Sequence, residues 1–422
     1  MSVTPRRAPA EVQGSAGWAP ARPPRRRSGV LITGAVIGLI LGGLALLLLI
    51  AYFVLALGPG FTFAGAVLAL FPLAVVLLGA RWIDRWEPEP PLVLGIGFLW
   101  GATVAVLGAL IVDAGVQIAV ASTGGPTDDT AVLQLVVQAP IVEEILKGFG
   151  VLLIFLFARR YFDGPVDGIV YATVVAGGFA FTENIQYFGL ELVGSGGFGI
   201  NVGMVFFLRG ILSPFAHAMF TAMTGLAIGI AARRGGRLPG LLAFVIGLIP
   251  AIALHALWNG SIFLTDNFFG FYVLVQVPLF IGAIVMVTML QRRERLLTQQ
   301  RLAEYAVAGW ITPAEVASLG TAAGRRMALA WARPRGLLRT MRSYIRDATR
   351  LASTRQRLLT GRDVPSGQAD ELQLLAKITE ARRIVMTPVV PGGAAAGGAA
   401  ASAPGAAPTR GTLPPPTGVP RP

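Results

Sequence analysis

The sequence predicts an all-α, polytopic membrane helix bundle of about eight transmembrane helices, followed by a mostly helical cytoplasmic C-terminal tail. Three observations lead to this fold class. Of the 422 residues, 54% are hydrophobic and only 14% are charged, which is typical of membrane proteins. The apolar residues gather in runs long enough to cross a bilayer. The connections between the runs are alternately basic and non-basic, as expected of a chain that crosses repeatedly.

Each apolar run can span the hydrocarbon core as a helix, which takes about 20 residues. The runs lie near residues 30–57, 61–80, 91–120, 131–158, 166–188, 202–232, 240–263 and 270–290. The first run follows a charged flank, as the apolar part of a signal peptide does. At roughly 28 residues it is too long for a cleaved segment, so we expect an uncleaved membrane helix.

Lys and Arg mark every second connection. The basic connections precede the first run and follow the second, fourth, sixth and eighth: RRSG, RWIDRWEPEPP, RRYFDGP, RRGGR and QRRER. The other connections contain neither residue: LGPG, STGGPTDDT, GSGGFG and TDNFFG. Because Lys and Arg favour the cytoplasmic side, this alternation places both termini in the cytoplasm of a multi-pass protein of the cell membrane.

Composition divides the chain into four parts. Residues 1–29 are rich in Arg and Pro, and we expect a basic, disordered cytoplasmic N-terminus. Residues 30–290 form the eight-helix transmembrane domain. Residues 291–386 show helix-like patterning, with TPAE at 312–315 as a helix start, and predict a basic helical cytoplasmic tail. Residues 387–422 are mostly Gly, Ala and Pro, and we expect them to be disordered.

Charge and cysteine content exclude several classes of function. The net charge of +13 would suit nucleic acid as a partner, but the excess of Lys and Arg lies outside residues 30–290, in tails beside the membrane. We therefore expect the lipid bilayer, and no nucleic acid, as a partner. The chain has no cysteine, which excludes disulfides, thiolate metal sites and a cysteine nucleophile.

Polar side chains inside the apolar runs are the candidates for function, because an ionised group at mid-bilayer costs about 2.5–3.5 kcal/mol on insertion scales. Without the connections, a short set is left: Asp113, Glu143, Glu144, Lys147, Glu183, Asn184, Arg209, His217, His255 and Asn259. The chain has only two histidines, and both fall in runs that follow the glutamate pair. This joint pattern favours one shared site.

The segment QAPIVEEILKGFG, residues 138–150, places three charges inside an apolar run. Glu143 and Lys147 are four residues apart and share a helix face, and Glu144 flanks it. One lysine neutralises one carboxylate, which leaves the other free to bind a metal or a proton. A buried ion pair with a purely structural role is the alternative, but a second carboxylate in the same turn makes it costly.

We expect the remaining polar residues to hold or balance the charges of the site rather than to take part in a reaction. Glu183 and Asn184 lie late in the fifth run, nearer the external face, where Glu183 is alternatively a hydrated interfacial carboxylate. Arg209 is interpreted as a counter-ion of Asp113 or Glu183. The segment EPEPP at 87–91 is interpreted as a proline-stiffened cytoplasmic turn.

Two histidines with glutamates and an asparagine suit a cation such as Zn²⁺. A catalytic zinc site needs three protein ligands and an open position, and two His with one Glu is a known set. The bound water loses a proton near neutral pH, and a second Glu can serve as the base. The spacing differs from the helical H-E-x-x-H motif, so the ligands would come from three helices of the bundle.

The motifs EEILK, FAFTEN, HAMFTAMTG and HALWN, with EPEP upstream, resemble the PrsW-type intramembrane protease family. More distantly, they are similar to the CAAX-processing and bacteriocin-immunity membrane proteases, which show a Glu-Glu motif, then a His, then a His four residues before Asn or Asp. The resemblance covers roughly residues 80–265 and excludes the C-terminal tail. The distant relatives carry an Arg four residues after the second Glu, where this chain has a Lys three residues after it.

The resemblance implies cleavage of a membrane-anchored protein within or at the edge of the bilayer. PrsW-type proteins are associated with the first cleavage of a membrane-spanning anti-sigma factor. From the resemblance and the residue pattern together, we expect catalysis by Glu143, Glu144 and His217, metal binding by Glu144, His217 and His255, and support by Lys147, Glu183, Asn184 and Asn259. Relatives divide between metal assistance and direct activation of water by Glu and His. The expected enzyme is therefore a membrane-embedded metallo- or glutamate-type endopeptidase, with Zn²⁺ as the expected cofactor.

Two other classes of function are open. Intramembrane Glu and His also form relays in ion- or proton-coupled transporters, although no paired inverted halves with broken helices are visible. A non-catalytic membrane adaptor would use the basic tail as a docking segment.

Overall fold

The structure is a computed structural model of the 422-residue chain, and it describes residues 29–234, 236, 238–361 and 364–386. The N-terminal segment expected to be disordered, apart from Gly29, and the Gly/Ala/Pro-rich segment 387–422 lie outside the described residues. The described residues form helices joined by short connections, with no strand among them.

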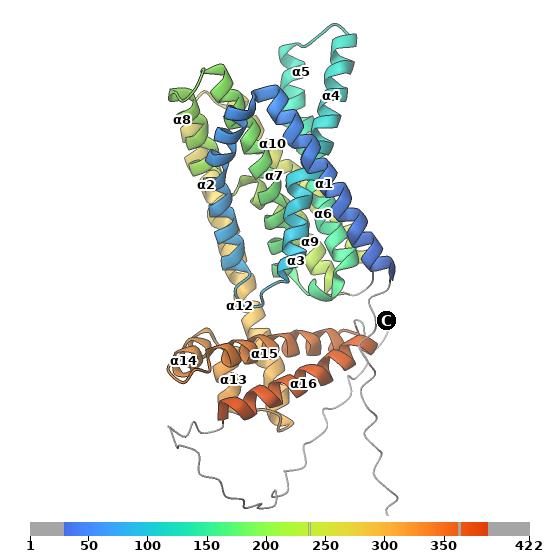
Figure 1. Cartoon of the computed structure of the whole chain (residues 1–422), viewed down its shortest axis with the longest axis vertical. Helices are drawn as coiled ribbons and strands as arrows, with labels where there is room; N and C mark the ends of the chain where they lie inside the picture. The colour runs from blue at the N-terminus through green and yellow to red at the C-terminus, as the bar shows by residue number, and fades with distance from the viewer. Residues whose placement is uncertain (1–28, 235, 237, 362–363, 387–422) are drawn as a thin grey trace, which may run out of the picture.

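Residues 29–290 are called the membrane body. Its first half consists of six helices, which Figure 1 shows in blue to green: α1 (Gly29–Leu57), α2 (Pro59–Ile83), α3 (Pro91–Leu99), α4 (Val106–Ser122), α5 (Asp128–Leu133) and α6 (Ala139–Phe157). The second half follows: α7 (Pro165–Gly194), α8 (Ile200–Phe206), α9 (Ala216–Ala232), α10 (Leu238–Leu264), α11 (Phe268–Phe271) and α12 (Val277–Val307). Four π-helical turns join helices into longer segments: Trp100–Ala105, Gln134–Gln138, Phe207–Leu212 and Tyr272–Gln276.

The described helices confirm the predicted all-α polytopic bundle. Seven segments are long and apolar enough to cross a membrane: Gly38–Leu57, Pro59–Ile83, Pro91–Ser122, Pro165–Gly194, Ile200–Ala232, Leu238–Leu264 and Phe268–Val307. The remaining predicted crossing, near residues 131–158, corresponds to α5 and α6, which run between the same two ends of the bundle (Figure 1). This crossing carries three charged residues, Glu143, Glu144 and Lys147, within its apolar stretch.

Helix α7 is the centre of the membrane body. In its most apolar stretch 94% of the residues are buried, whereas the corresponding fraction is 22% in α2 and 33% in α10. It packs against α2, α3, α6 and α9. Such complete burial in a bundle means that α7 meets other helices on all its faces, so side chains on it can reach several neighbours.

Glycines allow this close packing. A Cβ on Gly178 would lie 2.2 Å from the Phe98 carbonyl oxygen, and one on Gly168 would lie 2.0 Å from the Gly225 carbonyl oxygen. Small residues at such contacts let helix backbones approach closely, which is a main source of helix association in membranes. The position of α7 against α3 and α9 therefore depends on the absence of these side chains.

The C-terminal helices fold into a separate unit, called the cap (residues 291–386). It contains the end of α12 and four further helices: α13 (Pro313–Gly320), α14 (Ala322–Ala332), α15 (Leu338–Leu359) and α16 (Val364–Met386). Its own hydrophobic core includes Leu302, Tyr305, Met341, Tyr344, Leu351 and Ile378. The helix start predicted at 312–315 is present, because the Thr312 hydroxyl and the Glu315 carboxylate form the capping box of α13.

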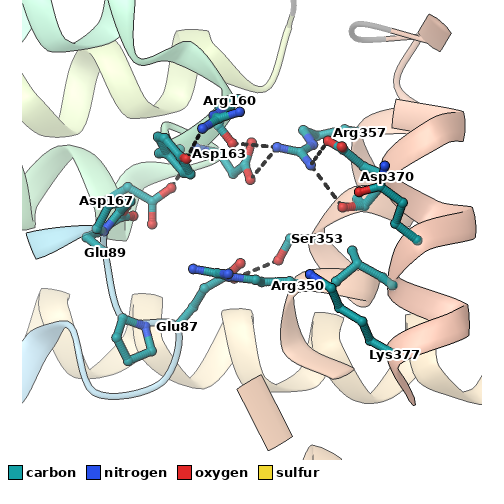
Figure 2. Close-up of a pocket in the computed structure, with 16 residues that line it drawn as sticks. Glu87, Glu89, Arg160, Asp163, Asp167, Arg350, Ser353, Arg357, Asp370 and Lys377 are labelled. Carbon is teal, nitrogen blue, oxygen red and sulfur yellow. Dashed lines mark hydrogen bonds and ion pairs between the residues drawn. The ribbon is translucent and has the colours of Figure 1, made fainter. Parts of the chain in front are cut away.

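The cap contacts the connections at one end of the membrane body (Figure 2). The Ser353 hydroxyl donates to Glu87 at 2.6 Å, and Arg357 pairs with Asp163 at 3.3 Å. Charged side chains line a cavity of about 260 Å³ between the two parts. Burial, together with the nearby carboxylate of Asp163, raises the pKa of Glu87 to about 8. Glu87 thus keeps its proton near neutral pH, which limits repulsion among the acids of this junction.

The glycine contacts of α7 lead to a prediction. Gly178→Ala places a methyl group against the backbone of α3, and overpacking of this kind costs about 1–3 kcal/mol or more. We expect less folded protein after detergent extraction, measured by size-exclusion chromatography. Gly115→Ala is the matched control, because a Cβ at Gly115 on α4 meets no atom within 4 Å. Equal yields of the two variants would contradict the proposed packing.

Candidate active site

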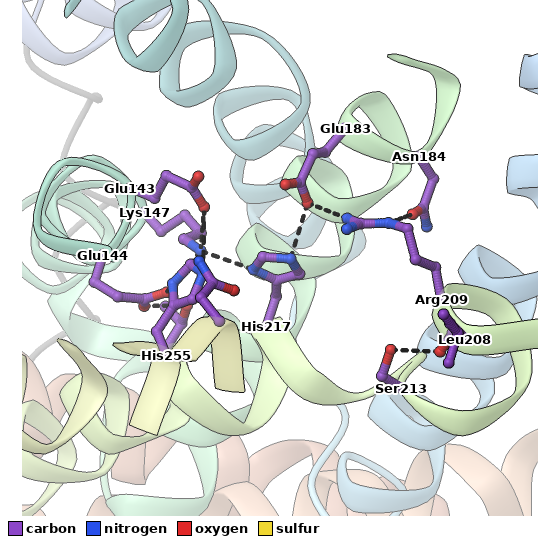
Figure 3. Close-up of polar contacts among 12 residues, drawn as sticks. Glu143, Glu144, Lys147, Glu183, Asn184, Leu208, Arg209, Ser213, His217 and His255 are labelled. Carbon is purple, nitrogen blue, oxygen red and sulfur yellow. Dashed lines mark hydrogen bonds and ion pairs between the residues drawn. The ribbon is translucent and has the colours of Figure 1, made fainter. Parts of the chain in front are cut away.

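Four helices bring the predicted polar residues together inside the membrane body (Figure 3). Helix α6 carries Glu143, Glu144 and Lys147, α7 carries Glu183, α9 carries His217, and α10 carries His255. At 1.5 Å per residue, Glu183 lies about 27 Å from the start of α7 and about 17 Å from its end. His255 lies about 26 Å and about 14 Å from the two ends of α10. The site is therefore inside the bundle, nearer the end that faces away from the cap.

Glu144 and Lys147 form the innermost ion pair of this site. Their side chains are both 0% exposed, and Lys147 Nζ lies 2.6 Å from Glu144 Oε1. The Thr221 hydroxyl donates to Glu144 Oε2 at 2.8 Å, and His255 Nδ1 lies 3.0 Å from Oε1. The Lys147 ammonium also lies 4.3 Å from the centre of the Phe179 ring. Both oxygens of Glu144 are thus engaged, and its charge is matched within the protein.

His255 is held by Glu144 on one side and faces Glu143 on the other. A neutral imidazole has one N–H donor and one lone pair. With the proton on Nδ1, which faces Glu144, the lone pair belongs to Nε2, and Nε2 lies 3.8 Å from Glu143 Oε2. The ring stacks on Phe220 with centroids 5.0 Å apart, which fixes its plane.

His217 has the same kind of support from a different carboxylate. Its Nε2 lies 2.9 Å from Glu183 Oε2, and the Arg209 guanidinium contacts the same oxygen at 2.5 Å. Arg209 Nε donates to Asn184 Oδ1 at 2.8 Å, so the Arg209 side chain is fixed at two points. With the proton of His217 on Nε2, the lone pair lies on Nδ1, which is 3.1 Å from Lys147 Nζ.

Glu143, His217 and His255 together could hold a metal ion. One ligand atom from each lies within 4.8 Å of the other two. The set is chemically suitable, because two imidazoles and one carboxylate are a known zinc ligand set, and metal-binding histidines usually donate their other N–H to a carboxylate. The sequence predicted Glu144 in place of Glu143. The Lys147 ammonium lies near the same donor atoms, and its charge opposes a cation unless Glu144 balances it.

Glu143 is the least engaged carboxylate of the site. Its nearest charged partner is Lys147 at 3.5 Å, and its side chain is 13% exposed. His217 lines a small cavity of about 20 Å³ together with Asn184, Arg209 and Trp258. A space of this size holds roughly one water molecule. The space for water thus lies beside His217, and Glu143 is not among the residues that line it.

Several expectations about individual residues can be compared with the structure. Arg209 pairs with Glu183, which was one of its two expected partners, while Asp113 is exposed on α4 and away from the site. Glu183 is bound to His217 rather than simply hydrated. Asn259 donates to the Leu135 carbonyl at 2.9 Å, so it joins α10 to the π-helical turn before α6.

The sequence reasoning missed Thr221 and Phe179. Thr221 is 0% exposed and follows His217 by four residues, so it lies on the same face of α9. This spacing was a usable signal, but threonine is neutral and attracts little notice in an apolar run. Phe179 lies four residues before Glu183 on α7 and had no signal beyond that spacing. The EPEP segment, which was interpreted as a turn, also contains two acids that are partly or fully buried, Glu87 and Glu89. Glu89 accepts a hydrogen bond from Tyr171.

Comparisons with known proteins agree with the geometry. Residues 89–283 match a family model described as PrsW family intramembrane metalloprotease. Three bacterial proteins named Protease PrsW are similar to the chain. The one from Oceanobacillus iheyensis is 28% identical over 173 residues, 40% of this chain and 72% of that protein. The one from Clostridioides difficile is 29% identical over 197 residues, 46% of this chain and 78% of that protein.

The third relative, from Geobacillus kaustophilus, is 30% identical over 146 residues, 35% of this chain and 57% of that protein. The comparison with solved structures found no match. The family match ends at residue 283, so it includes the whole site and excludes the cap.

The Glu144–Lys147 pair leads to a prediction about folding. Removing one partner of a buried ion pair costs about 3–5 kcal/mol, because the other charge is left buried alone. We expect Lys147→Met to lower the amount of folded protein in the membrane. The measurement is an immunoblot of membranes together with size-exclusion chromatography after detergent extraction. The double variant Glu144→Gln/Lys147→Met removes both charges and should recover much of the yield. A single variant that folds as well as the wild type would show that the pair is not needed for stability.

Proposed function

Since residues 89–283 belong to the PrsW family of intramembrane metalloproteases, we propose that this chain is an endopeptidase that cleaves a membrane-spanning protein, with Zn²⁺ bound by Glu143, His217 and His255. One observation carries the proposal. Each imidazole is held by its own carboxylate through one ring nitrogen. The other nitrogen of His255 faces Glu143 at 3.8 Å and that of His217 lies 3.1 Å from Lys147 Nζ, while one ligand atom from each of Glu143, His217 and His255 lies within 4.8 Å of the other two.

Different residues of the chain would bind the metal and orient its ligands. A bound zinc ion polarises a carbonyl group and lowers the pKa of a coordinated water to near neutrality. His217 and His255 supply nitrogen ligands whose orientation Glu183 and Glu144 fix. Glu143 supplies the carboxylate ligand. The sequence predicted Glu144 as the carboxylate ligand, whereas the pairing of Glu144 with Lys147 supports Glu143 in that role.

Proton transfer follows from the same arrangement. Glu143 has a second oxygen and a partly exposed side chain, so it is also the carboxylate best able to accept a proton from water. Glu144 is less suited, because Lys147, Thr221 and His255 engage it. Arg209 is a positioning residue, because it fixes the Glu183 carboxylate that in turn holds His217 Nε2.

The depth of the site supports a membrane-spanning substrate. The charged groups lie inside a bundle whose outer surface is apolar, where irregular polar chemistry needs a water-accessible cavity. The cavity beside His217 supplies such a space. An extended segment of a transmembrane substrate would have to enter near α9 and α10. By resemblance to the family, an anti-sigma factor or a similar signalling protein is the proposed class of substrate.

The proposed topology has both termini in the cytoplasm. The basic connections after α2, α6 and α9 all lie at the cap's end of the bundle. Arg325 of the cap contacts Trp86, Arg357 contacts Asp163, and the Arg233 side chain lies near Gly164. This common placement supports a cytoplasmic cap, because Lys and Arg concentrate on that side.

The proposed ligand set predicts different effects for the two neighbouring glutamates. Glu143→Gln and Glu144→Gln should each abolish cleavage of a tagged single-span substrate in membranes at equal protein abundance. His217→Ala should do the same, and His255→Ala should weaken or abolish cleavage. Metal content separates the roles. Glu143→Gln should lose the zinc of the purified protein, while Glu144→Gln should bind it roughly 10–100-fold more weakly. Full cleavage by both glutamine variants would reject the proteolytic site and favour a transporter.

The proposed topology predicts the outcome of reporter fusions. Fusions after residues 160, 236 and 300 should report the cytoplasm, and fusions at residues 126 and 195 should report the opposite side. The first set lies in basic connections and the second in connections without Lys or Arg, so each set is the control for the other. A cytoplasmic signal at residue 126 or 195 would overturn the orientation and the number of crossings.

A further inference from the structure

The segment from α14 into α15 carries arginines without acidic partners. Residues 325–346 contain seven Arg and no Asp, Glu or Lys. Six of the seven are exposed: Arg326, Arg333, Arg335, Arg339, Arg342 and Arg346. The first five, called the arginine face, form no ion pair with any residue that the structure describes, and Arg346 reaches Asp347 only at 3.9 Å. No carboxylate of the described residues therefore neutralises these five charges.

Exposed apolar side chains accompany these charges. Met327 is 68% exposed and Trp331 is 40% exposed, and their four-residue spacing places them on the same side of α14. The Arg335 guanidinium lies 4.5 Å from the centre of the Trp331 ring. Tryptophan beside basic residues is typical of surfaces that lie in the membrane–water interface.

The start of α14 lies level with the end of the membrane body. Arg325 donates to the Trp86 carbonyl at 2.9 Å, and its guanidinium lies 3.3 Å from the centre of the Trp86 ring. Trp86 follows the last residue of α2, Ile83, by three residues. Figure 1 shows α14 at the outer edge of the cap, just below the level at which the membrane body ends, and it packs against α13 and α15.

We propose that the arginine face, with Met327 and Trp331, binds the anionic phospholipid headgroups of the leaflet on the cap's side of the membrane. Guanidinium groups match phosphate geometry with two parallel hydrogen bonds. Clusters of four to eight basic residues beside a membrane helix bind anionic lipids, and each Arg near the surface strengthens the attraction about fivefold. The membrane helices hold the face at this level, which favours lipid over a soluble acidic protein. The inference does not depend on peptidase activity.

The absence of native cysteine allows a direct test on the full chain. Met327→Cys carries a polarity-sensitive fluorophore, and the protein is placed in nanodiscs of phosphatidylcholine alone or mixed with phosphatidylglycerol. We expect a blue-shifted emission and protection from an aqueous quencher only with phosphatidylglycerol. The protection should be lost in 1 M salt, where the screening length falls to about 3 Å.

Matched variants separate this surface from a general effect of charge. Arg339→Gln/Arg342→Gln should lose the protection, whereas Lys377→Gln/Arg383→Gln, which removes two charges from α16, should keep it. A label at Leu372→Cys on α16, which is 67% exposed and outside the arginine face, should not respond. Size-exclusion profiles verify that all variants fold.

Three results would overturn the proposal: equal emission at residue 327 in both kinds of nanodisc, full protection in Arg339→Gln/Arg342→Gln, or an equal response at residue 372. Protection that needs an added acidic peptide or RNA in phosphatidylcholine nanodiscs would also overturn it, in favour of a soluble anionic partner.

Discussion

Glu144 and Lys147 lie one turn apart on α6 with neither side chain exposed, and the placement of the other polar groups depends on their ion pair. Each buried ion costs several kcal/mol of desolvation, which is offset only when the geometry is good and the remaining hydrogen-bonding positions are filled. Thr221 on α9 and His255 on α10 fill them. The need to satisfy one buried carboxylate thus fixes the register of three helices, and the histidines take their positions from that register.

The three glutamates of the site differ through their neighbours rather than their chemistry. Glu144 is neutralised by Lys147, and Glu183 is shared by Arg209 and His217, so both serve mainly to hold other groups. Glu143 has only longer contacts and partial exposure. The cap lies at the other end of the bundle, about 26 Å from His255 along α10. It therefore organises the connections and their acids without entering the site.

Much of the site could be predicted because a bilayer makes polar residues conspicuous. Glu143, Glu144, His217 and His255 were found by their presence in apolar runs, and the all-α bundle by the runs themselves. The pairing of each carboxylate with its histidine could not be predicted, because neighbouring residues differ by about 100° around a helix and the rotation of α6 against α9 and α10 is set by packing. The cap was predicted as helical, but its contact with Glu87 joins residues 266 positions apart, and no local pattern encodes that.

X-ray absorption at the zinc edge tests the central claim most directly, because it reports the atoms around the ion in the purified full-length protein. The proposed site predicts one zinc per chain with two imidazole nitrogens at about 2.0–2.1 Å and a carboxylate oxygen at about 2.0–2.2 Å. The imidazole signal should fall by half in His255→Ala, and the carboxylate contribution should disappear in Glu143→Gln together with most of the metal. A protein that cleaves its substrate at full rate without bound metal, or whose zinc shows no imidazole neighbours, would contradict the proposed site.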